Sequence, residues 1–381
     1  FYENYKEDTN YNDYTLTPFD AAVQVDLIRQ KWLDNDFYGT TFSANYKNET
    51  LDFIIGGAYN QYKGDHFGKV IWTSVGNLQG MEDNYYNYFG NKNDGNLFTK
   101  INYKINKKWS LFGDVQYRNI VYTASGVYNG EIKNTFNFLN PKAGITYTIN
   151  TKNSIYFSYA KANREPNRTD YENNTLLPEK LDDYELGWRS TNNGFILNWN
   201  LYYMNYKNQL ILTGRIDDVG NPIRANTENS YRFGTEIDAQ IKICEKLHYQ
   251  FNTTFSANKN KNVLLNQNTD IAYSPNVVAG GNLVYKPIKN ATISLLQKFV
   301  GSQYMNNIES PEAKLNDYTT TDLNIVYEIN PKKWIKNITI TALVNNVLAK
   351  EYSSNGYMWD IYPYYFPQAK RNFLIGLNLR F

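Results

Sequence analysis

Hydrophobic and polar residues alternate with a period of two in many segments of this chain, most completely in its last ten residues. One face of that segment carries Phe373, Ile375, Leu377, Leu379 and Phe381, and the other carries Asn372, Leu374, Gly376, Asn378 and Arg380. This period is that of a β-strand with one apolar face. A strand needs about 9–11 residues to cross the hydrocarbon layer of a membrane, and this segment has that length.

A second segment, residues 231–243, shows what the polar face contains. Its apolar face carries Tyr231, Phe233, Thr235, Ile237, Ala239, Ile241 and Ile243. Its other face carries Arg232, Gly234, Glu236, Asp238, Gln240 and Lys242, of which four are charged. In a packed core each buried charge would need a partner, whereas charges that line a water-filled lumen need none. We therefore predict an all-β fold, an antiparallel transmembrane β-barrel, rather than a sandwich of two packed sheets.

Short and long connections alternate between segments of this kind. The short connections lie at residues 47–50, 106–108, 150–153, 191–194, 244–247, 286–290 and 330–337. The long connections lie at residues 64–94, 162–179, 213–229, 260–271, 301–318 and 347–371, with a shorter one near 125–134. Outer-membrane barrels have short periplasmic turns and long external loops, so we predict about 16 strands and a C-terminus on the periplasmic side. The first strand is either 1–6 or 22–31.

The composition agrees with a barrel and excludes several other classes. The chain has 35 Tyr, 20 Phe and 7 Trp, and aromatic residues form belts at both interfaces of a membrane barrel. A net charge of +2 gives no reason to expect a nucleic-acid partner. The single cysteine, Cys244, excludes a disulfide framework. The mean hydropathy is −0.61 and no apolar run approaches 18 residues, so we expect no transmembrane helix.

Several short motifs in the second half of the chain resemble those of TonB-dependent outer-membrane receptors, in the form found in Bacteroidetes. In that family an Arg-x-Pro motif leads into a loop, which ends in Leu-x-Pro-Glu and a strand with Glu-x-Gly. The matching segments here are Arg164-Glu165-Pro166, Leu177-Pro178-Glu179 and Glu185-Leu186-Gly187. Another strand start of the family looks like residues 231–236. Its penultimate-strand motif is similar to residues 343–348 with Tyr352. Its C-terminal assembly signal resembles Leu379-Arg380-Phe381.

The resemblance implies a domain organisation and a set of partners. The family's barrel has about 22 strands around a plug, so residues 1–381 would be the C-terminal portion of the barrel, without the N-terminal plug and the first strands. The implied partners are outer-membrane lipid, the TonB complex through the missing plug, and the barrel assembly machinery through Phe381. A small-molecule or oligosaccharide ligand completes the set, and we expect no cofactor and no metal.

Two arginines at the start of one long loop are candidate ligand contacts. Arg164 and Arg168 lie close in sequence to Asp170 and Glu172. A guanidinium group can capture an anionic ligand. The alternative is a set of ion pairs that stabilises the loop, and surface charges alone do not exclude it. We expect Glu179 to be structural.

Two aromatic clusters in long loops are the other candidate contacts, because aromatic rings stack on sugars, haem or siderophores. The first consists of Tyr85, Tyr86, Tyr88 and Phe89. The second consists of Tyr357, Trp359, Tyr362, Tyr364, Tyr365 and Phe366, and from both clusters we predict Tyr85, Tyr86, Tyr88, Tyr357, Trp359, Tyr362 and Tyr364 as ligand contacts. The same residues could instead belong to the aromatic belts at the membrane surface.

The two histidines give little support for a haem or metal site. His66 is predicted to lie in a loop, within Gly64–Gly68, where an imidazole could bind haem iron or cobalt. In haem receptors of this family a histidine is expected between the Arg-x-Pro and Leu-x-Pro-Glu motifs, and residues 167–176 contain none. His248 falls on the polar face of residues 248–257 and is predicted to line the lumen.

No enzymatic motif competes with transport. The sequence has no nucleophile elbow, zinc-protease histidine pair, phosphate-binding glycine loop or dinucleotide fingerprint. We therefore predict a non-enzymatic receptor of the Gram-negative outer membrane, which takes up a scarce solute (a siderophore, haem, cobalamin or an oligosaccharide) with energy from TonB. The nearest alternative is a passive porin, since about 16 strands can close around an aqueous channel. An outer-membrane enzyme barrel would need a Ser–His pair that the sequence does not suggest.

Overall fold

The computed structural model describes residues 2–5, 27–74, 83–128, 130–217, 220–262, 267–331 and 334–381. Seventeen strands in this part of the chain form one sheet, and two small hairpins accompany it. The strands of the large sheet are β1 (Tyr2–Tyr5), β2 (Leu27–Lys47), β3 (Leu51–Thr73), β4 (Asn84–Lys104), β5 (Trp109–Val127), β6 (Gly130–Asn150), β7 (Asn153–Arg164), β8 (Glu179–Asn192), β9 (Phe195–Ile216), β10 (Pro222–Cys244), β11 (Leu247–Asn262), β12 (Gln267–Asp270), β13 (Val277–Tyr285), β14 (Ala291–Val300), β17 (Tyr318–Ile329), β18 (Asn337–Asn345) and β21 (Asn372–Arg380). The elements outside this sheet are α1 (Arg168–Glu172), β15 (Gln303–Tyr304), η2 (Pro311–Ala313), β16 (Lys314–Leu315), β19 (Ser353–Trp359) and β20 (Tyr362–Pro367).

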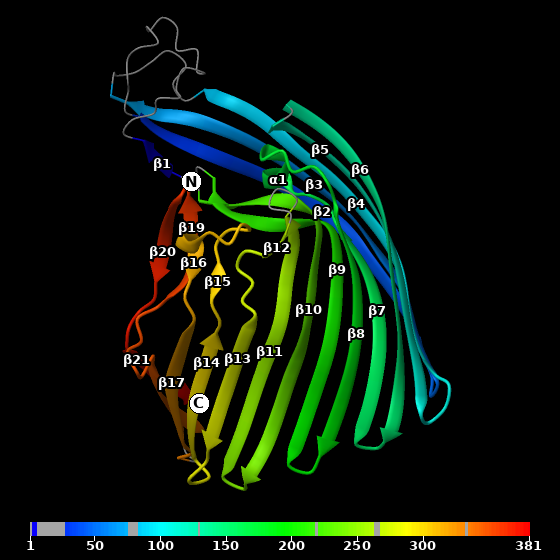
Figure 1. Cartoon of the computed structure of the whole chain (residues 1–381), viewed down its shortest axis with the longest axis vertical. Helices are drawn as coiled ribbons and strands as arrows, with labels where there is room; N and C mark the ends of the chain where they lie inside the picture. The colour runs from blue at the N-terminus through cyan, green and yellow to red at the C-terminus, as the bar shows by residue number, and fades with distance from the viewer. Residues whose placement is uncertain are drawn as a thin grey trace, which may run out of the picture.

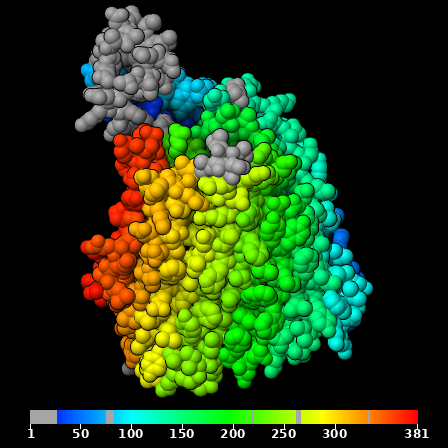
Figure 2. Space-filling view, viewed as in Figure 1, coloured from blue at the N-terminus to red at the C-terminus, as the bar shows by residue number. Residues whose placement is uncertain are grey.

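The long strands follow one another as an antiparallel meander that curves into a barrel wall (Figure 1). This confirms the predicted fold class and the approximate strand number. Strand β2 pairs with β1 and β3, while β21 pairs with β18, so the described strands form a curved sheet with two edges. Seen from outside, the wall from β7 to β14 is a continuous layer (Figure 2). Among the described residues, no helix is long and apolar enough to cross a bilayer.

The register of the sheet fixes which side chains share its concave face. Tyr122 of β5 stacks against Tyr171 of α1, which lies within the curve of the sheet (Figure 1). Arg118, four residues before Tyr122, is on the same face. Following the strand pairs from β5 to β10 puts Glu236, Asp238 and Lys242 on that face too. The predicted inward charges are therefore confirmed, and Phe233 and Ile243 face outward with 48% and 56% of their surface exposed.

The outward face has the layered composition of a membrane-spanning surface. On β3 to β5, exposed aliphatic side chains lie between an aromatic row near the short turns and another further up. The aliphatic residues are Ile55, Leu97, Ile101, Leu111 and Val115; the aromatic ones are Tyr103 and Trp109 below and Tyr59 and Tyr117 above. An apolar band flanked by two aromatic belts is the pattern of an outer-membrane barrel. Residues beyond Tyr59 and Tyr117 on these strands therefore lie outside the membrane-spanning segments.

All seven predicted short connections are present, and three of them close in the same way. The side-chain oxygens of Asn48, Asn106 and Asn150 each accept two backbone N–H groups from the residues two and three positions ahead. An asparagine at the start of a tight turn makes this bond readily, because its short side chain reaches the backbone two residues on. We call this side of the sheet the short-turn end, and Phe381 lies there, where its carbonyl accepts a hydrogen bond from Lys336.

Four of the predicted long loops are wrong in extent. Residues 64–73 and 84–94 belong to β3 and β4, residues 125–127 and 130–134 to β5 and β6, residues 213–216 and 222–229 to β9 and β10, and residues 260–262 and 267–270 to β11 and β12. The physical reason is that these strands continue past the membrane, where water touches both faces. Alternation of apolar and polar residues then no longer marks a strand, although backbone pairing continues.

The strands differ greatly in height. Strands β2 to β6 have 19 to 23 residues, whereas β13, β14, β17, β18 and β21 have 9 to 12. The short pairs β7–β8, β14–β17 and β18–β21 carry the three long connections that fold back on themselves, at residues 165–178, 301–317 and 346–371. We call this end of the sheet the long-loop end. Its three folded connections are the places where a ligand would meet structured side chains.

Candidate functional site at the long-loop end

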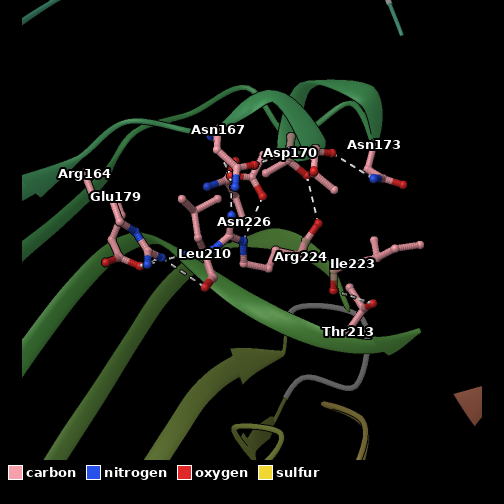
Figure 3. A network of polar contacts seen from close by, with 12 residues as sticks. Arg164, Asn167, Asp170, Asn173, Glu179, Leu210, Thr213, Ile223, Arg224 and Asn226 are labelled. Carbon is pink, nitrogen blue, oxygen red and sulfur yellow. Dashed lines mark hydrogen bonds and ion pairs between the residues drawn. The ribbon is translucent and has the colours of Figure 1, made fainter. Parts of the chain in front are cut away.

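The loop at residues 165–178, which we call the latch, is built around α1. Asn167 caps the helix by accepting the N–H of Asp170, and Asp170 accepts the N–H of Asn167 in return. Asp170 is 1% exposed and also forms two hydrogen bonds, 2.9 and 3.0 Å long, with the guanidinium of Arg224 on β10 (Figure 3). A bidentate pair of this kind fixes both distance and orientation. It joins α1 to a strand 54 residues further along the chain.

The two ends of the latch are joined by the family-like motifs themselves. Arg164 forms an ion pair of 3.1 Å with Glu179, and Glu179 accepts the N–H of Leu210 on β9 at 2.8 Å (Figure 3). Asn226 of β10 exchanges hydrogen bonds with the backbone of Leu177. The structural role predicted for Glu179 is confirmed by these contacts. Arg164 therefore serves the loop, and its contact with a ligand stays a prediction.

Arg168 bonds to two neighbouring strands, β4 and β5. Its guanidinium donates to the carbonyls of Phe89 at 3.1 Å and Ser125 at 2.8 Å, and it pairs with Glu172 one helical turn away at 2.8 Å. These contacts bear out the ion-pair interpretation of the two arginines. Three of the five N–H groups of Arg168 donate in these contacts, and its contact with a ligand stays a prediction.

A charged network beside the latch was not predicted. Arg118 on β5 binds both Asp94 on β4 and Glu165 of the latch, and Lys92 binds Glu165 at 2.5 Å. Burial alone would raise the pKa of Glu165, but the hydrogen bond from Lys92 and the two nearby positive charges hold it below its usual value. Within the alternating residues 109–118, Arg118 shares a polar face with Asp114 and Gln116. Only the fold shows that Arg118 binds Glu165, which lies 47 residues further along the chain.

The first aromatic cluster lies in a strand and not in a loop, which corrects the prediction. Tyr85, Tyr86 and Tyr88 are the start of β4, paired with residues 66–69 of β3. Tyr86 and Tyr88 stack with ring centres 5.0 Å apart, and Tyr85 meets Tyr86 edge-on at 4.9 Å. Tyr88 is directly opposite His66 and keeps 39% of its surface exposed. The cluster lies above the outward aromatic row at Tyr59, so it is not part of that belt.

The second aromatic cluster forms the hairpin β19–β20. Tyr357 lies opposite Tyr364, and Trp359 lies opposite Tyr362. The rings of Tyr357 and Tyr364 are stacked at 5.1 Å and are nearly parallel, with Phe366 beside them. The hairpin is seen at the upper left of the wall, next to β15 and β16 (Figure 1). The predicted contacts at Tyr357, Trp359, Tyr362 and Tyr364 are thus brought together on one face, whereas Tyr85, Tyr86 and Tyr88 form a separate group.

His66 lies on the concave face of β3, which corrects its predicted place in a loop. It has Tyr88 opposite it, and its Nε2 would lie 3.8 Å from a Cβ at Gly90. Burial, and then the nearby charge of Arg168, lower the pKa of His66 to about 4, although Asp65 opposes the shift. The imidazole is therefore neutral at pH 7. In the part of the chain that the structure describes, no group of three or more His, Cys, Asp or Glu could hold a metal ion.

The lowered pKa of His66 makes the folded protein sensitive to mild acid. Unfolded histidine binds a proton near pH 6.5, whereas the folded protein resists protonation until about pH 4. The contribution of neutral His66 to the free energy of unfolding is fully present above pH 6.5. It is lost as the pH falls toward 4. We expect His66→Gln to reduce the loss of thermal stability between pH 7 and pH 4.5. Equal losses in the two proteins, measured by thermal unfolding in detergent, would contradict this assignment.

The family of the chain follows from a comparison of its whole sequence. A family model described as TonB dependent receptor-like, beta-barrel, matches residues 1–347. The chain belongs to this family. Members of the TonB-dependent receptor family are receptors and transporters of the Gram-negative outer membrane rather than enzymes, and they bind small-molecule ligands. No protein with a curated function matches the sequence.

Solved structures of TonB-dependent receptors share the fold. The ferric yersiniabactin uptake receptor FyuA from Yersinia pestis superposes with a TM-score of 0.67 at 15% identity, over 93% of this chain and 54% of FyuA. The siderophore receptor PiuA from Acinetobacter baumannii gives 0.67 at 17% identity, over 93% and 56%. The ferric citrate transporter FecA in the unliganded form gives 0.71 at 14%, over 92% and 55%. The chain spans about half the length of these receptors.

Proposed function

We propose that this chain is the C-terminal part of the barrel wall of an outer-membrane receptor that takes up a scarce solute with energy from TonB. The proposed ligands are those named for the family resemblance: a siderophore, haem, cobalamin or an oligosaccharide. Receptors with the same fold are described as carriers of ferric yersiniabactin, siderophores and ferric citrate, which supports uptake of a chelate or another bulky solute. The lipid-facing wall and Phe381 would contact the outer membrane and the barrel assembly machinery.

The observation that carries this proposal is the latch. A passive channel works with its lumen open, whereas here a loop is folded inward and tied to β4 and β5 on one side and to β9 and β10 on the other. The residues that tie its ends together are those of the Arg-x-Pro and Leu-x-Pro-Glu motifs. This feature favours a receptor over a porin.

The lumen wall also supports a second body inside the barrel. Asp183, Glu185 and Glu236 share the concave face of β8 and β10, and the described residues form no ion pair with them. One carboxylate oxygen of Asp183 is buried without a hydrogen-bond partner. A buried polar atom costs about 1–3 kcal/mol when it is left unsatisfied. We infer that a plug with basic side chains fills this part of the lumen in the whole receptor.

Dependence on TonB distinguishes the proposed receptor from a porin. We expect uptake by cells that carry the whole receptor to stop when the TonB gene is deleted or when an uncoupler abolishes the proton-motive force. Binding of the ligand to the cell surface should continue under both conditions. The measurement is accumulation of radiolabelled solute against surface-bound solute at 0 °C. Uptake that persists at the same rate without TonB would favour the porin interpretation and would overturn the proposal.

A further inference from the structure

The hairpin β19–β20 presents five aromatic side chains on one face. In register, Tyr357 pairs with Tyr364 and Trp359 with Tyr362, while Phe366 continues the same face beyond Tyr364. The exposed fractions of Trp359, Tyr362, Tyr364 and Phe366 are 57%, 62%, 47% and 48%. We call this set (Tyr357, Trp359, Tyr362, Tyr364 and Phe366) the aromatic platform. A row of exposed rings on one face is unusual for a loop in water and indicates a binding surface.

The opposite face of the hairpin is fixed to the rest of the protein. Met358 is 5% exposed and packs in a buried cluster with Met305, Ala313 and Leu315 of the 301–317 connection. The carbonyl of Gly356 accepts a hydrogen bond from the Tyr273 hydroxyl at 2.9 Å, and the Tyr365 hydroxyl donates to the carbonyl of Glu312. The platform is therefore held in place before any ligand arrives, which lowers the entropy lost on binding.

The surroundings of the aromatic platform do not favour an anionic ligand. The two connections that form it, residues 301–317 and 346–371, contain four cationic and five anionic side chains. Among the cations, Lys370 pairs with Glu351, and Arg371 donates to the carbonyl of Val347, while Lys314 and Lys350 form no ion pair with the described residues. The arginines of the latch are held by carboxylates of the protein. Because anionic side chains outnumber cationic ones in these connections, their net charge does not favour a carboxylate, catecholate or haem ligand.

We propose that the aromatic platform binds a neutral saccharide by stacking pyranose rings on Trp359 and its neighbours. One face of a pyranose presents C–H groups that pack on an aromatic ring, while its hydroxyls remain in water or bond to tyrosine hydroxyls. Such a ligand needs a flat apolar surface and no charged partner. The aromatic platform is such a surface, since its five side chains are uncharged aromatic rings. This inference rests on the proposed receptor function, and it selects the oligosaccharide from the four classes of solute considered.

Ligand-observed NMR titration of the whole receptor in detergent tests the inference, with maltoheptaose, cellohexaose and xylohexaose as neutral probes. We expect saturable binding of at least one of them. Trp359→Ala should raise its Kd about tenfold, which corresponds to 1.4 kcal/mol, and Trp359→Phe should restore most of the affinity. Trp334→Ala is the matched control, because Trp334 is 92% exposed at the short-turn end, and it should leave the Kd unchanged.

Three results would overturn the saccharide assignment. The first is the absence of saturable binding of all three sugars to the unmodified receptor. The second is a Kd that Trp359→Ala and Trp334→Ala leave equally unaffected. The third is binding of ferric citrate or haemin that depends on Trp359. Failure of the proposed function has a different signature, because uptake would then persist without TonB while sugar binding to the platform remained. The two outcomes are measured in separate experiments and are distinguishable.

Discussion

Replacing Ile237 with arginine should prevent the wall from assembling in a membrane. Ile237 lies on the outward face of β10, between Trp199 of β9 and Thr253 of β11, seven residues above the short turn that begins at Cys244. An arginine that faces lipid near the middle of the bilayer costs about 2–4 kcal/mol. We expect the substituted protein to lose most of its folded form in the outer-membrane fraction, measured as the heat-dependent shift in electrophoretic mobility.

The neighbouring residue provides the control for this substitution. Asp238 faces the lumen, where Asp238→Asn removes a charge from water and not from lipid. We expect this variant to assemble as well as the unmodified protein. Equal loss of folded protein in Ile237→Arg and Asp238→Asn would mean that the two faces of β10 have been assigned wrongly.

Replacing Asp170 with alanine should release the latch. The carboxylate of Asp170 is fully buried, caps the N-terminus of α1 and binds Arg224 through both oxygens. Removing one partner of a buried ion pair costs about 3–5 kcal/mol, because the other partner is left without compensation. Each 1.4 kcal/mol is a factor of ten, so amide hydrogens in residues 165–178 should exchange at least a hundredfold faster. Hydrogen exchange followed by mass spectrometry measures this directly.

Glu172 is the matched control for the latch. It lies on the same helix and pairs with Arg168, but its side chain is 40% exposed. An exposed pair contributes about 0.2–1 kcal/mol, so Glu172→Ala should change the exchange of residues 165–178 by less than tenfold. If both variants exchanged alike, the bond between Asp170 and Arg224 would not be what holds the loop. Exchange in β13, β14 and β17, which β11 separates from the latch-bound strand β10, should be the same in all three proteins.

The membrane-spanning part of the fold could be predicted from the sequence because lipid and water touch alternate residues there. That is why residues 231–243 and 372–381 gave the correct faces, and why all the short connections were found. The prediction failed at residues 64–73 and 84–94 because both faces of a strand meet water above the membrane. Gly64, His66 and Gly68 then look like a turn, although β3 continues through them.

The candidate site was only partly predictable for a different reason. The motif residues of the latch could be located, but their partners come from strands that are distant in sequence, such as Arg224 for Asp170 and Arg118 for Glu165. Nothing in the chain near residue 170 indicates which arginine binds it. The platform was easier to recognise, because Tyr357, Trp359, Tyr362 and Tyr364 are close in sequence and the register of one hairpin brings them together.

The unequal lengths of the strands make the rim of the wall uneven. Strand β4 has 21 residues and β21 has 9, a difference of roughly 40 Å along the strands at about 3.3 Å per residue. The rim of the wall is therefore uneven, with long strands at β2 to β6 and at β9 and β10 and short strands at β13 to β21. The folded connections rise from the short strands, so there side chains of loops take the place that backbone-paired strands hold elsewhere along the rim. The hairpin with the aromatic rings is one of these, because it follows β18 and precedes β21.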